Sequence, residues 1–403
     1  MEFGPIWRAL LKNKGGAILI ALQIAVTMAI MVNSISIMQE RATNMQRPSG
    51  MDEANTLTFA SISFASDADN RATYINDLEM LRNTPGVINA VGTNSFPLRG
   101  GGWSMGLQTE PGEDMGGVGS AIYFGDEHMI ETFGVELIDG ENFSPEQVVF
   151  LDPDNFRWEP YVIVTEALAK TLFPDEEGSV VGKTAYINQN DPVQIIGVID
   201  QLQAPWQGWD EVEHALFSPV KRAEGFARYV VRTEPGMRDE LLPQLEEMLA
   251  SADKTRLIRA AQTFDEVREG AYLGDSAMIK ILGFVITLLT IITGLGIVGL
   301  ASFNVSRRTR QIGIRRALGA TKPAIMRYFM LENFMISSVG VVVGGALAIG
   351  LNIFMVETFN LTPMSWWVVP AAMIVLWLVG QAAVAGPARR ATRIAPSIAT
   401  RSG

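Results

Sequence analysis

The chain contains no cysteine and only two histidines in 403 residues. Without cysteine there can be no disulfide framework, no thiol chemistry and no metal site with cysteine ligands. His128 and His214 lie far apart in the sequence, so we do not expect a catalytic metal centre built on imidazole. There is also no His-Glu-x-x-His motif and no recognisable catalytic triad. We therefore expect a protein that is not an enzyme and that binds no metal or cofactor itself.

Acidic and basic residues are unevenly distributed along the chain. Residues 39–275 contain 40 acidic and 17 basic residues, a net charge of −23, whereas the remainder contains 3 and 15, a net charge of +12. We interpret the acidic clusters at Glu113–Asp114, Asp175–Glu177 and Asp210–Glu213 as solvated faces; contact with a cationic substrate or a basic partner is the alternative. We expect no nucleic-acid partner.

Four long apolar runs predict four transmembrane helices. Lys and Arg cluster at both chain ends and in the loop between the second and third runs, which places these parts in the cytoplasm. The predicted order is a cytoplasmic N-terminus (1–15), a first membrane helix (16–38), an extracytoplasmic domain (39–277), a second membrane helix (278–303), a cytoplasmic loop (304–327), a third membrane helix (328–355), a short outer loop (356–365), a fourth membrane helix (366–386) and a cytoplasmic tail (387–403).

The first run is about as long as a membrane span and lacks a good cleavage site, so we interpret it as an uncleaved anchor; a signal peptide is the alternative. The acidic segment mixes strand and helix patterns, which predicts an inserted α/β domain. The expected elements are strands at Thr56–Phe64, Val87–Val91, Tyr161–Thr165, Ala185–Asn188, Val193–Ile199 and Ala227–Arg232, and helices from Asp69 to Arg82, at Glu166–Phe173 and at Gly236–Ser251.

The loop between the second and third runs contains seven basic residues and no acid: Arg307, Arg308, Arg310, Arg315, Arg316, Lys322 and Arg327. These charges would anchor the topology among anionic headgroups. Docking of a partner is the alternative, with Ile312, Ile314, Ala317 and Leu318 making apolar contacts along the membrane face and the arginines facing outwards. Charge alone does not separate the two.

The order of residues in this loop favours docking. Residues 310–321 read RQIGIRRALGAT and resemble the signature of the FtsX/MacB family of ABC-transporter permeases. Val162–Phe173, Tyr123–Ser144 and Thr263–Ser276 are similar to the MacB-type periplasmic domain. This resemblance implies a stalk that carries the domain, for which the polar helical stretches 33–47 and 263–277 are the natural candidates. The resemblance covers nearly the whole chain, and implies a type VII ABC system whose permease has no fused ATPase.

The family implies that the loop couples to a cytoplasmic ABC ATPase dimer, which would bind ATP and Mg²⁺. We carry this role to the matching positions Arg310, Ile312, Gly313, Arg315, Arg316, Leu318, Gly319 and Ala320. Two positions depart from the pattern: Gln311 replaces the usual acid, and Pro323 is a potential helix breaker before Tyr328. Glu332 is an acid within the third run and needs a partner, for which Arg327 or Arg316 is the candidate.

Two glycine motifs resemble nucleotide sites without their context. Gly178–Thr184 lacks the first glycine of a phosphate-binding loop, so we expect a turn before a strand. Gly294, Gly296 and Gly299 match a dinucleotide fingerprint but lie within a membrane run. With Gly340 and Gly344 we interpret them as helix-packing positions, either within one chain or against a second permease.

The sequence as a whole predicts a membrane α-helical protein with four transmembrane helices and an extracytoplasmic α/β domain on a helical stalk. The resemblance implies a permease of the bacterial inner membrane that passes the motion of a separate ATPase to its periplasmic domain, driving efflux of a drug, peptide or toxin. Its expected partners include a second, identical or paralogous permease, membrane lipid, and a periplasmic adaptor with an outer-membrane duct. An FtsX-like regulator of a cell-wall hydrolase and a subunit of a lipoprotein-releasing complex are the alternatives.

Overall fold

A computed structural model describes residues 14–64, 69–113, 116–152, 156–359 and 362–395. The chain forms two compact units, Met1–Met45 with Gly274–Gly403, and Gln46–Leu273. Most of the predicted N-terminus 1–15, two residues of the outer loop 356–365 and the end of the tail 387–403 lie outside the described residues. Each unit has its own hydrophobic core.

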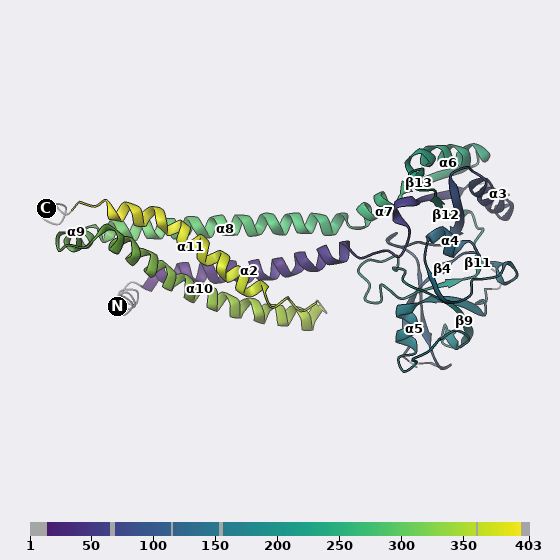
Figure 1. Cartoon of the computed structure of the whole chain (residues 1–403), viewed down its shortest axis with the longest axis horizontal. Helices are drawn as coiled ribbons and strands as arrows, with labels where there is room; N and C mark the ends of the chain where they lie inside the picture. Colours follow the sequence, from purple (N-terminus) through teal and green to yellow (C-terminus); the bar gives the residue numbers. More distant parts are fainter. Residues whose placement is uncertain (1–13, 65–68, 114–115, 153–155, 360–361, 396–403) are drawn as a thin grey trace. The chain divides into compact units, whose positions relative to one another are not determined.

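The first unit contains four helices that are long and apolar enough to cross a membrane, so the expected helix number is confirmed. Figure 1 shows them as long, roughly aligned helices. They are α2 (Lys14–Met45), α8 (Leu273–Arg307), α10 (Lys322–Phe359) and α11 (Val368–Thr392), with the short helix α9 (Thr309–Ala317) between α8 and α10. With 35 residues, α8 is about 52 Å long, well beyond the roughly 30 Å of a bilayer core.

Helix α10 packs against both α2 and α11, and their apolar side chains share one core. Polar side chains of α2 also form hydrogen bonds with α8 and α10. Thr27 and Thr293 share a buried 2.8 Å hydrogen bond, and Gln23 Nε2 donates to the carbonyl of Ile292, so α2 and α8 are tied together. Asn33 Nδ2 donates to the carbonyl of Ala348 on α10.

The second unit contains a four-stranded antiparallel sheet in the order β13-β1-β12-β2. Alternate side chains such as Leu57, Phe59 and Tyr229 face a core that the helices α3 and α6 cover. The bounds are β1 (Thr56–Ser63), β2 (Val87–Thr93), β12 (Phe226–Thr233), β13 (Arg256–Thr263), α3 (Asn70–Arg82), α6 (Arg238–Ala252), α7 (Phe264–Ala271) and the 3-10 turn η1 (Glu53–Asn55).

A second, mixed sheet of seven strands has the order β5-β9-β7-β10-β4-β3-β8. Its residues lie between β2 and β12 in the sequence, so it is an insertion into the first sheet. Its elements are β3 (Trp103–Gln108), β4 (Val118–Phe124), β5 (Leu137–Gly140), β7 (Tyr161–Thr165), β8 (Thr184–Ile187), β9 (Asp191–Ile199), β10 (Ala215–Ser218), α4 (Met129–Phe133) and α5 (Glu166–Leu172); η2 (Pro145–Gln147) and the pair β6 (Val149–Phe150) and β11 (Val220–Lys221) lie beside it.

The expected strands and helices of this unit are present, and Asp69 caps α3 as predicted, accepting hydrogen bonds from the backbone of Arg71 and Ala72. Pro323 does not break a helix: it lies in the first turn of α10, where a backbone N–H has no intrahelical partner to lose.

Candidate functional site

The predicted coupling loop folds around the short helix α9, which Figure 1 shows at the end of the helical unit. The helix ends at Ala317, and Gly319, two residues later, has a φ of +94°, a conformation that glycine adopts freely but that strains other residues. The backbone N–H of Gly319 donates to the carbonyl of Arg316, and that of Ala320 donates to the carbonyl of Arg315. This is the usual way in which a glycine with positive φ terminates an α-helix. The chain can therefore reverse within a few residues and begin α10 at Lys322.

One face of α9 is buried. Ile312 and Gly313 are inaccessible, and Ile312 packs in a cluster with Ile325 and Phe329 of α10 and Ala388 of α11. Two of the residues predicted to couple to an ATPase therefore face the interior of the unit. They position α9 on the ends of two long helices.

Arg316 also points inward. Its Nη1 donates to the carbonyls of Thr392 and Ile394 at 3.0 and 2.9 Å. These carbonyls lie at the C-terminal end of α11, where a cation also complements the helix dipole. The expectation that the arginines all face outwards is wrong for Arg316, which ties α9 to α11.

Glu332 is paired with Arg308. Arg308 Nη1 lies 2.9 and 3.1 Å from the two carboxylate oxygens, and the Glu332 side chain is 6% exposed. The predicted partners Arg327 and Arg316 are both wrong. Arg327 is exposed, and Arg316 is committed to the end of α11.

The remaining surface of α9 combines charge with exposed apolar side chains. Arg310 and Arg315 are exposed, Ile314 is 43% exposed and Leu318 is 83% exposed. The guanidinium carbon of Arg315 lies 4.9 Å from the ring centre of Tyr328, a cation–π contact that holds this arginine at the helix surface.

A small cavity of about 140 Å³ separates α9 from the first turns of α10. It is lined by Arg308, Gln311, Arg315, Ala320 and Tyr328, among others. The predicted coupling positions did not include Gln311 or Tyr328, and Ile314 was expected only as an apolar contact along the membrane face. Ile314 and Leu318 are four residues apart, a spacing that places two helical residues on the same face, and this spacing could have predicted their shared exposed surface.

The predicted packing glycines differ in their surroundings. A Cβ at Gly340 would lie 2.8 Å from Ile24 Cβ, and one at Gly344 would lie 2.6 Å from Met28 Cβ, so α2 and α10 are in close contact within the chain. A Cβ at Gly296 would meet the side chain of Gln23, and one at Gly294 would reach Val379 only at 3.8 Å. Gly299 has open space around its Cβ position.

A second cluster lies where the chain enters and leaves the second unit (Gln46–Leu273), which is inserted between α2 and α8 and is called the inserted unit below. Arg268 of α7 donates to both carboxylate oxygens of Glu53 in η1 and to the carbonyl of Arg47. Burial alone would raise the pKa of Glu53, but the hydrogen bonds from Arg268 and Ser49 outweigh it and lower that pKa. The entering and leaving segments are thus held together by charge-assisted hydrogen bonds.

Within the helical unit, Arg41 of α2 forms an ion pair with Asp275 of α8. Both residues lie outside the predicted spans 16–38 and 278–303, in the expected stalk. This pair and the Thr27–Thr293 hydrogen bond connect α2 and α8 at two levels.

Gly102–Gly106 matches the Gly-x-Ser-x-Gly motif of serine hydrolases literally. A nucleophile elbow places its serine on a sharp turn between a strand and a helix. Ser104 instead lies within β3, which continues to Gln108. Within the described ranges, no group of three His, Asp or Glu side chains is placed to bind a metal ion.

Comparison with known families agrees with this architecture. The MacB-like periplasmic core domain matches residues 17–250, more than half of the chain. The chain belongs to the MacB-like family of ABC transporter permeases. The FtsX-like permease C-terminal domain matches residues 283–396, which contain α9, α10 and α11. The permease is thus a membrane protein with a MacB-like core domain inserted between its first and second long helices.

Several relatives are similar over about three fifths of the chain. The macrolide export ATP-binding/permease protein MacB of Azoarcus sp. (strain BH72) is 26% identical over 63% of the permease and 39% of its own length. MacB of Brucella abortus (strain 2308) is 27% identical over 62% and 40%, and the uncharacterised ABC transporter permease YknZ of Bacillus subtilis (strain 168) is 25% identical over 62% and 64%. The match thus spans about two fifths of the length of the MacB relatives.

Among solved structures, the periplasmic region of MacB from Actinobacillus actinomycetemcomitans covers 56% of the permease and 98% of its own chain, with 20% identity and a TM-score of 0.34. The extracellular domain of the YknZ transporter from Gram-positive bacteria covers 50% and 99%, with 16% identity and a TM-score of 0.31.

Proposed function

We propose that the chain is the permease subunit of an ABC exporter in the bacterial inner membrane. ATP hydrolysis on a separate cytoplasmic ATPase dimer, which binds ATP and Mg²⁺, would drive movement of the periplasmic domain. The observation that carries this proposal is the division of α9 into two faces. Ile312, Gly313 and Arg316 attach it to the long helices, while Arg310, Ile314, Arg315 and Leu318 are exposed.

A force on this exposed face would reach several helices together. Arg316 connects α9 to the end of α11, and Arg308, the residue that precedes α9, pairs with Glu332 of α10. Close glycine contacts join α10 to α2, and the Arg41–Asp275 ion pair joins α2 to α8. These contacts favour transmission by rigid-body movement over a route through a channel.

The inserted unit is built to receive such a movement at its two chain connections. The segment after α2 and the segment before α8 are held together by the contacts of Arg268 with Glu53 and with the Arg47 carbonyl. A movement of either segment would therefore also move the other. A pair of permeases, identical or paralogous, would close at the cytoplasmic face, and the stalk helices would pass this motion to the periplasmic domains.

The substrate class is proposed from the relatives. Proteins named macrolide export ATP-binding/permease proteins are among them, and we propose efflux of a drug, peptide or toxin. A periplasmic adaptor and an outer-membrane duct would complete the route.

The test is co-purification of the ATPase with the full permease. In the variant Arg310→Glu/Arg315→Glu we expect normal membrane insertion and unfolding temperature. Binding of the ATPase and stimulation of its activity should fall by about tenfold or more, since charges at an interface are reversed. Arg316 is left unchanged because its substitution would also disturb the end of α11.

Arg327→Glu supplies the matched control. Arg327 is exposed near the start of α10, on the same predicted side of the membrane, and lies outside the α9 surface. This variant should retain the ATPase. If the α9 variant also binds and stimulates the ATPase normally, its arginines act only as topology anchors and the coupling proposal is wrong.

A further inference from the structure

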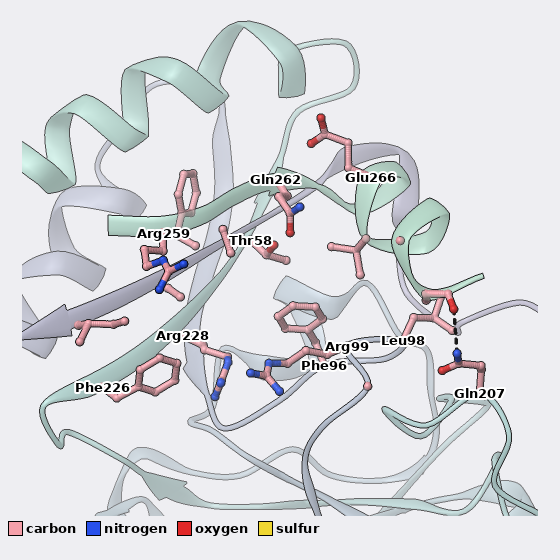
Figure 2. Close-up of a pocket in the computed structure, with 18 residues that line it drawn as sticks. Thr58, Phe96, Leu98, Arg99, Gln207, Phe226, Arg228, Arg259, Gln262 and Glu266 are labelled. Carbon is pink, nitrogen blue, oxygen red and sulfur yellow. Dashed lines mark hydrogen bonds between the residues drawn. The ribbon is translucent and has the colours of Figure 1, made fainter. Parts of the chain in front are cut away.

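A pocket of about 620 Å³ lies in the inserted unit, on the face of the first sheet that α3 and α6 do not cover. Figure 2 shows the side chains that line it. They come from β1, β12 and β13, from the loop after β2, from the loop between β9 and β10 (Gln207) and from α7. Its volume is within the range of roughly 300 to 1,000 Å³ that is usual for small-molecule sites.

Three arginines line this pocket: Arg99, Arg228 and Arg259. In the register of the sheet, Ala60 of β1 pairs with Arg228 on one neighbouring strand and with Arg259 on the other. The uncharged Ala60 thus lies between Arg228 and Arg259. A carboxylate at this position could pair with both arginines. Figure 2 shows Arg99 beside Arg228.

None of these three arginines forms an ion pair with an acid in the described part of the chain. Glu266 also lines the pocket, but its carboxylate accepts the backbone N–H of Thr263 in the capping box of α7. The concentration of unpaired positive charge is unusual because residues 39–275 carry a net charge of −23.

Two of the three charges, those of Arg99 and Arg228, are partly removed from water. Burial, followed by repulsion from Arg99 and Arg222, lowers the pKa of Arg228 to about 10. Burial also lowers the pKa of Arg99. Arg228 donates to the neutral carbonyl of Asn94, and Arg99 donates to that of Gly101. A bound anion would offset the cost of holding these cations together.

A β-bulge brings Arg259 to this face. Thr58 pairs with Gln262, but Ala60 pairs with Arg259, so β13 contains one extra residue between these pairs. The extra residue moves the side chains of β13 that precede it, up to Arg259, to the opposite face of the sheet. As a result Ile258 packs toward the core covered by α3 and α6, while Arg259 lines the pocket.

Backbone strain is concentrated at the same place. Leu98 and Ala260 have φ values of +65° and +49°, in the left-handed region that such residues rarely adopt. Both line the pocket, and each is next to one of the three arginines. Strained backbone of this kind recurs at binding sites, where the surrounding structure maintains it.

The walls near the arginines are apolar and include Phe96, Leu98, Phe226 and Val267. The site therefore combines a cationic centre with surfaces for an apolar body. We propose that this pocket binds an amphipathic anion, a carboxylate, sulfonate or phosphate attached to an aromatic or aliphatic group. The proposal concerns ligand binding by the permease alone and does not depend on ATPase coupling.

The probe is 2-naphthalenesulfonate, with neutral 2-naphthalenemethanol as its uncharged counterpart. Equilibrium dialysis against the full chain in phosphatidylcholine nanodiscs should show saturable binding of the sulfonate only. Arg99→Gln/Arg228→Gln should weaken it by about tenfold or more, because hydrogen bonds to charged groups are lost. Arg71→Gln, an exposed arginine of α3 outside the pocket, should bind as the unaltered chain does.

Two further variants guard against misfolding. Arg259→Gln changes an exposed side chain and should also weaken binding. Ala60→Glu introduces a carboxylate between the two arginines, and should abolish binding without lowering the unfolding temperature. Displacement of the sulfonate by lysophosphatidylglycerol would identify a lipid as the natural source of the anion, whereas a lack of displacement would point to a soluble organic acid.

The proposal is overturned if the unaltered chain shows no saturable binding of the sulfonate. It is equally overturned if the sulfonate and the alcohol bind alike, or if the pocket variants and Arg71→Gln give the same affinity. None of these results would bear on ATPase binding to α9, so the two proposals fail separately.

Discussion

Arg308 donates hydrogen bonds to both carboxylate oxygens of Glu332, although the two residues are separated by a helix and a turn. The Glu332 side chain is 6% exposed and that of Arg308 is 18% exposed. The pair connects the residue that precedes α9 to the third long helix. A buried ion pair of this kind costs little when both members are present, but leaves an uncompensated charge when one is removed.

We predict that Arg308→Gln destabilises the permease by about 3 to 5 kcal/mol, the range for breaking a buried pair. Glu332→Gln should cost less, because Arg308 is more exposed and can reach water. The double variant should be more stable than Arg308→Gln alone, since no buried charge remains. Thermal unfolding in nanodiscs measures the three differences, and equal losses in all three would show that the pairing is unimportant.

Much of the architecture could be predicted because its causes are local. Apolar runs long enough to cross a bilayer define the four long helices, and Asp69 before an amphipathic run predicts the start of α3. The alternation of Thr56–Phe64 predicted β1, which ends one residue earlier.

The side-chain pairs could not be predicted, because they depend on how separate helices return to one another. The sequence suggested Arg327 or Arg316 as the partner of Glu332, and nothing in it singled out Arg308. The turn at Gly319 brings α9 back across α10 and α11, and this decides that Arg308 reaches Glu332 while Arg316 reaches Thr392. The arginine pocket joins residues 99, 228 and 259, and the bulge that exposes Arg259 leaves no composition signal.

Gly344 should tolerate no side chain. A Cβ there would lie 2.6 Å from Met28 Cβ and 2.7 Å from the Ala25 carbonyl oxygen, both parts of α2. We expect Gly344→Ala to separate α2 from α10 and to lower stability by about 1 to 3 kcal/mol, the usual cost of overpacking. Gly299→Ala is the matched control, since its Cβ would enter open space. Equal unfolding temperatures for the two variants would contradict a close helix contact at Gly344.

The pairing of Glu53 with Arg268 predicts a dependence on pH. The pKa of Glu53 is lowered from its usual value of 4.5 in the folded protein. A carboxylate with a lowered pKa stabilises the fold above its unfolded pKa, and this contribution disappears as the pH falls through the folded pKa. Glu53→Gln should therefore lower the stability by about 1 to 3 kcal/mol at pH 7, and the difference from the unaltered protein should shrink below pH 4.5.

Thermal unfolding of both proteins across this pH range measures the difference. Glu247→Gln, an exposed residue of α6, controls for the loss of one negative charge. A gap between Glu53→Gln and the unaltered protein that stays constant on acidification would show that the ion pair does not cause it.

The bulge in β13 predicts opposite responses at two adjacent alanines. Ala260 has a φ of +49° and is exposed, so glycine would relieve a left-handed conformation that costs other residues about 1 to 2 kcal/mol. Glycine also loses more backbone entropy on folding, by roughly 0.5 to 1 kcal/mol, and Ala260→Gly should therefore be neutral or slightly stabilising. Ala261 has no such strain and packs against the core, so Ala261→Gly suffers the entropy cost and loses a contact. We expect Ala260→Gly to unfold at the higher temperature of the two. The reverse order would mean that the chain does not bulge at Ala260, and Arg259 would then have no reason to face the pocket.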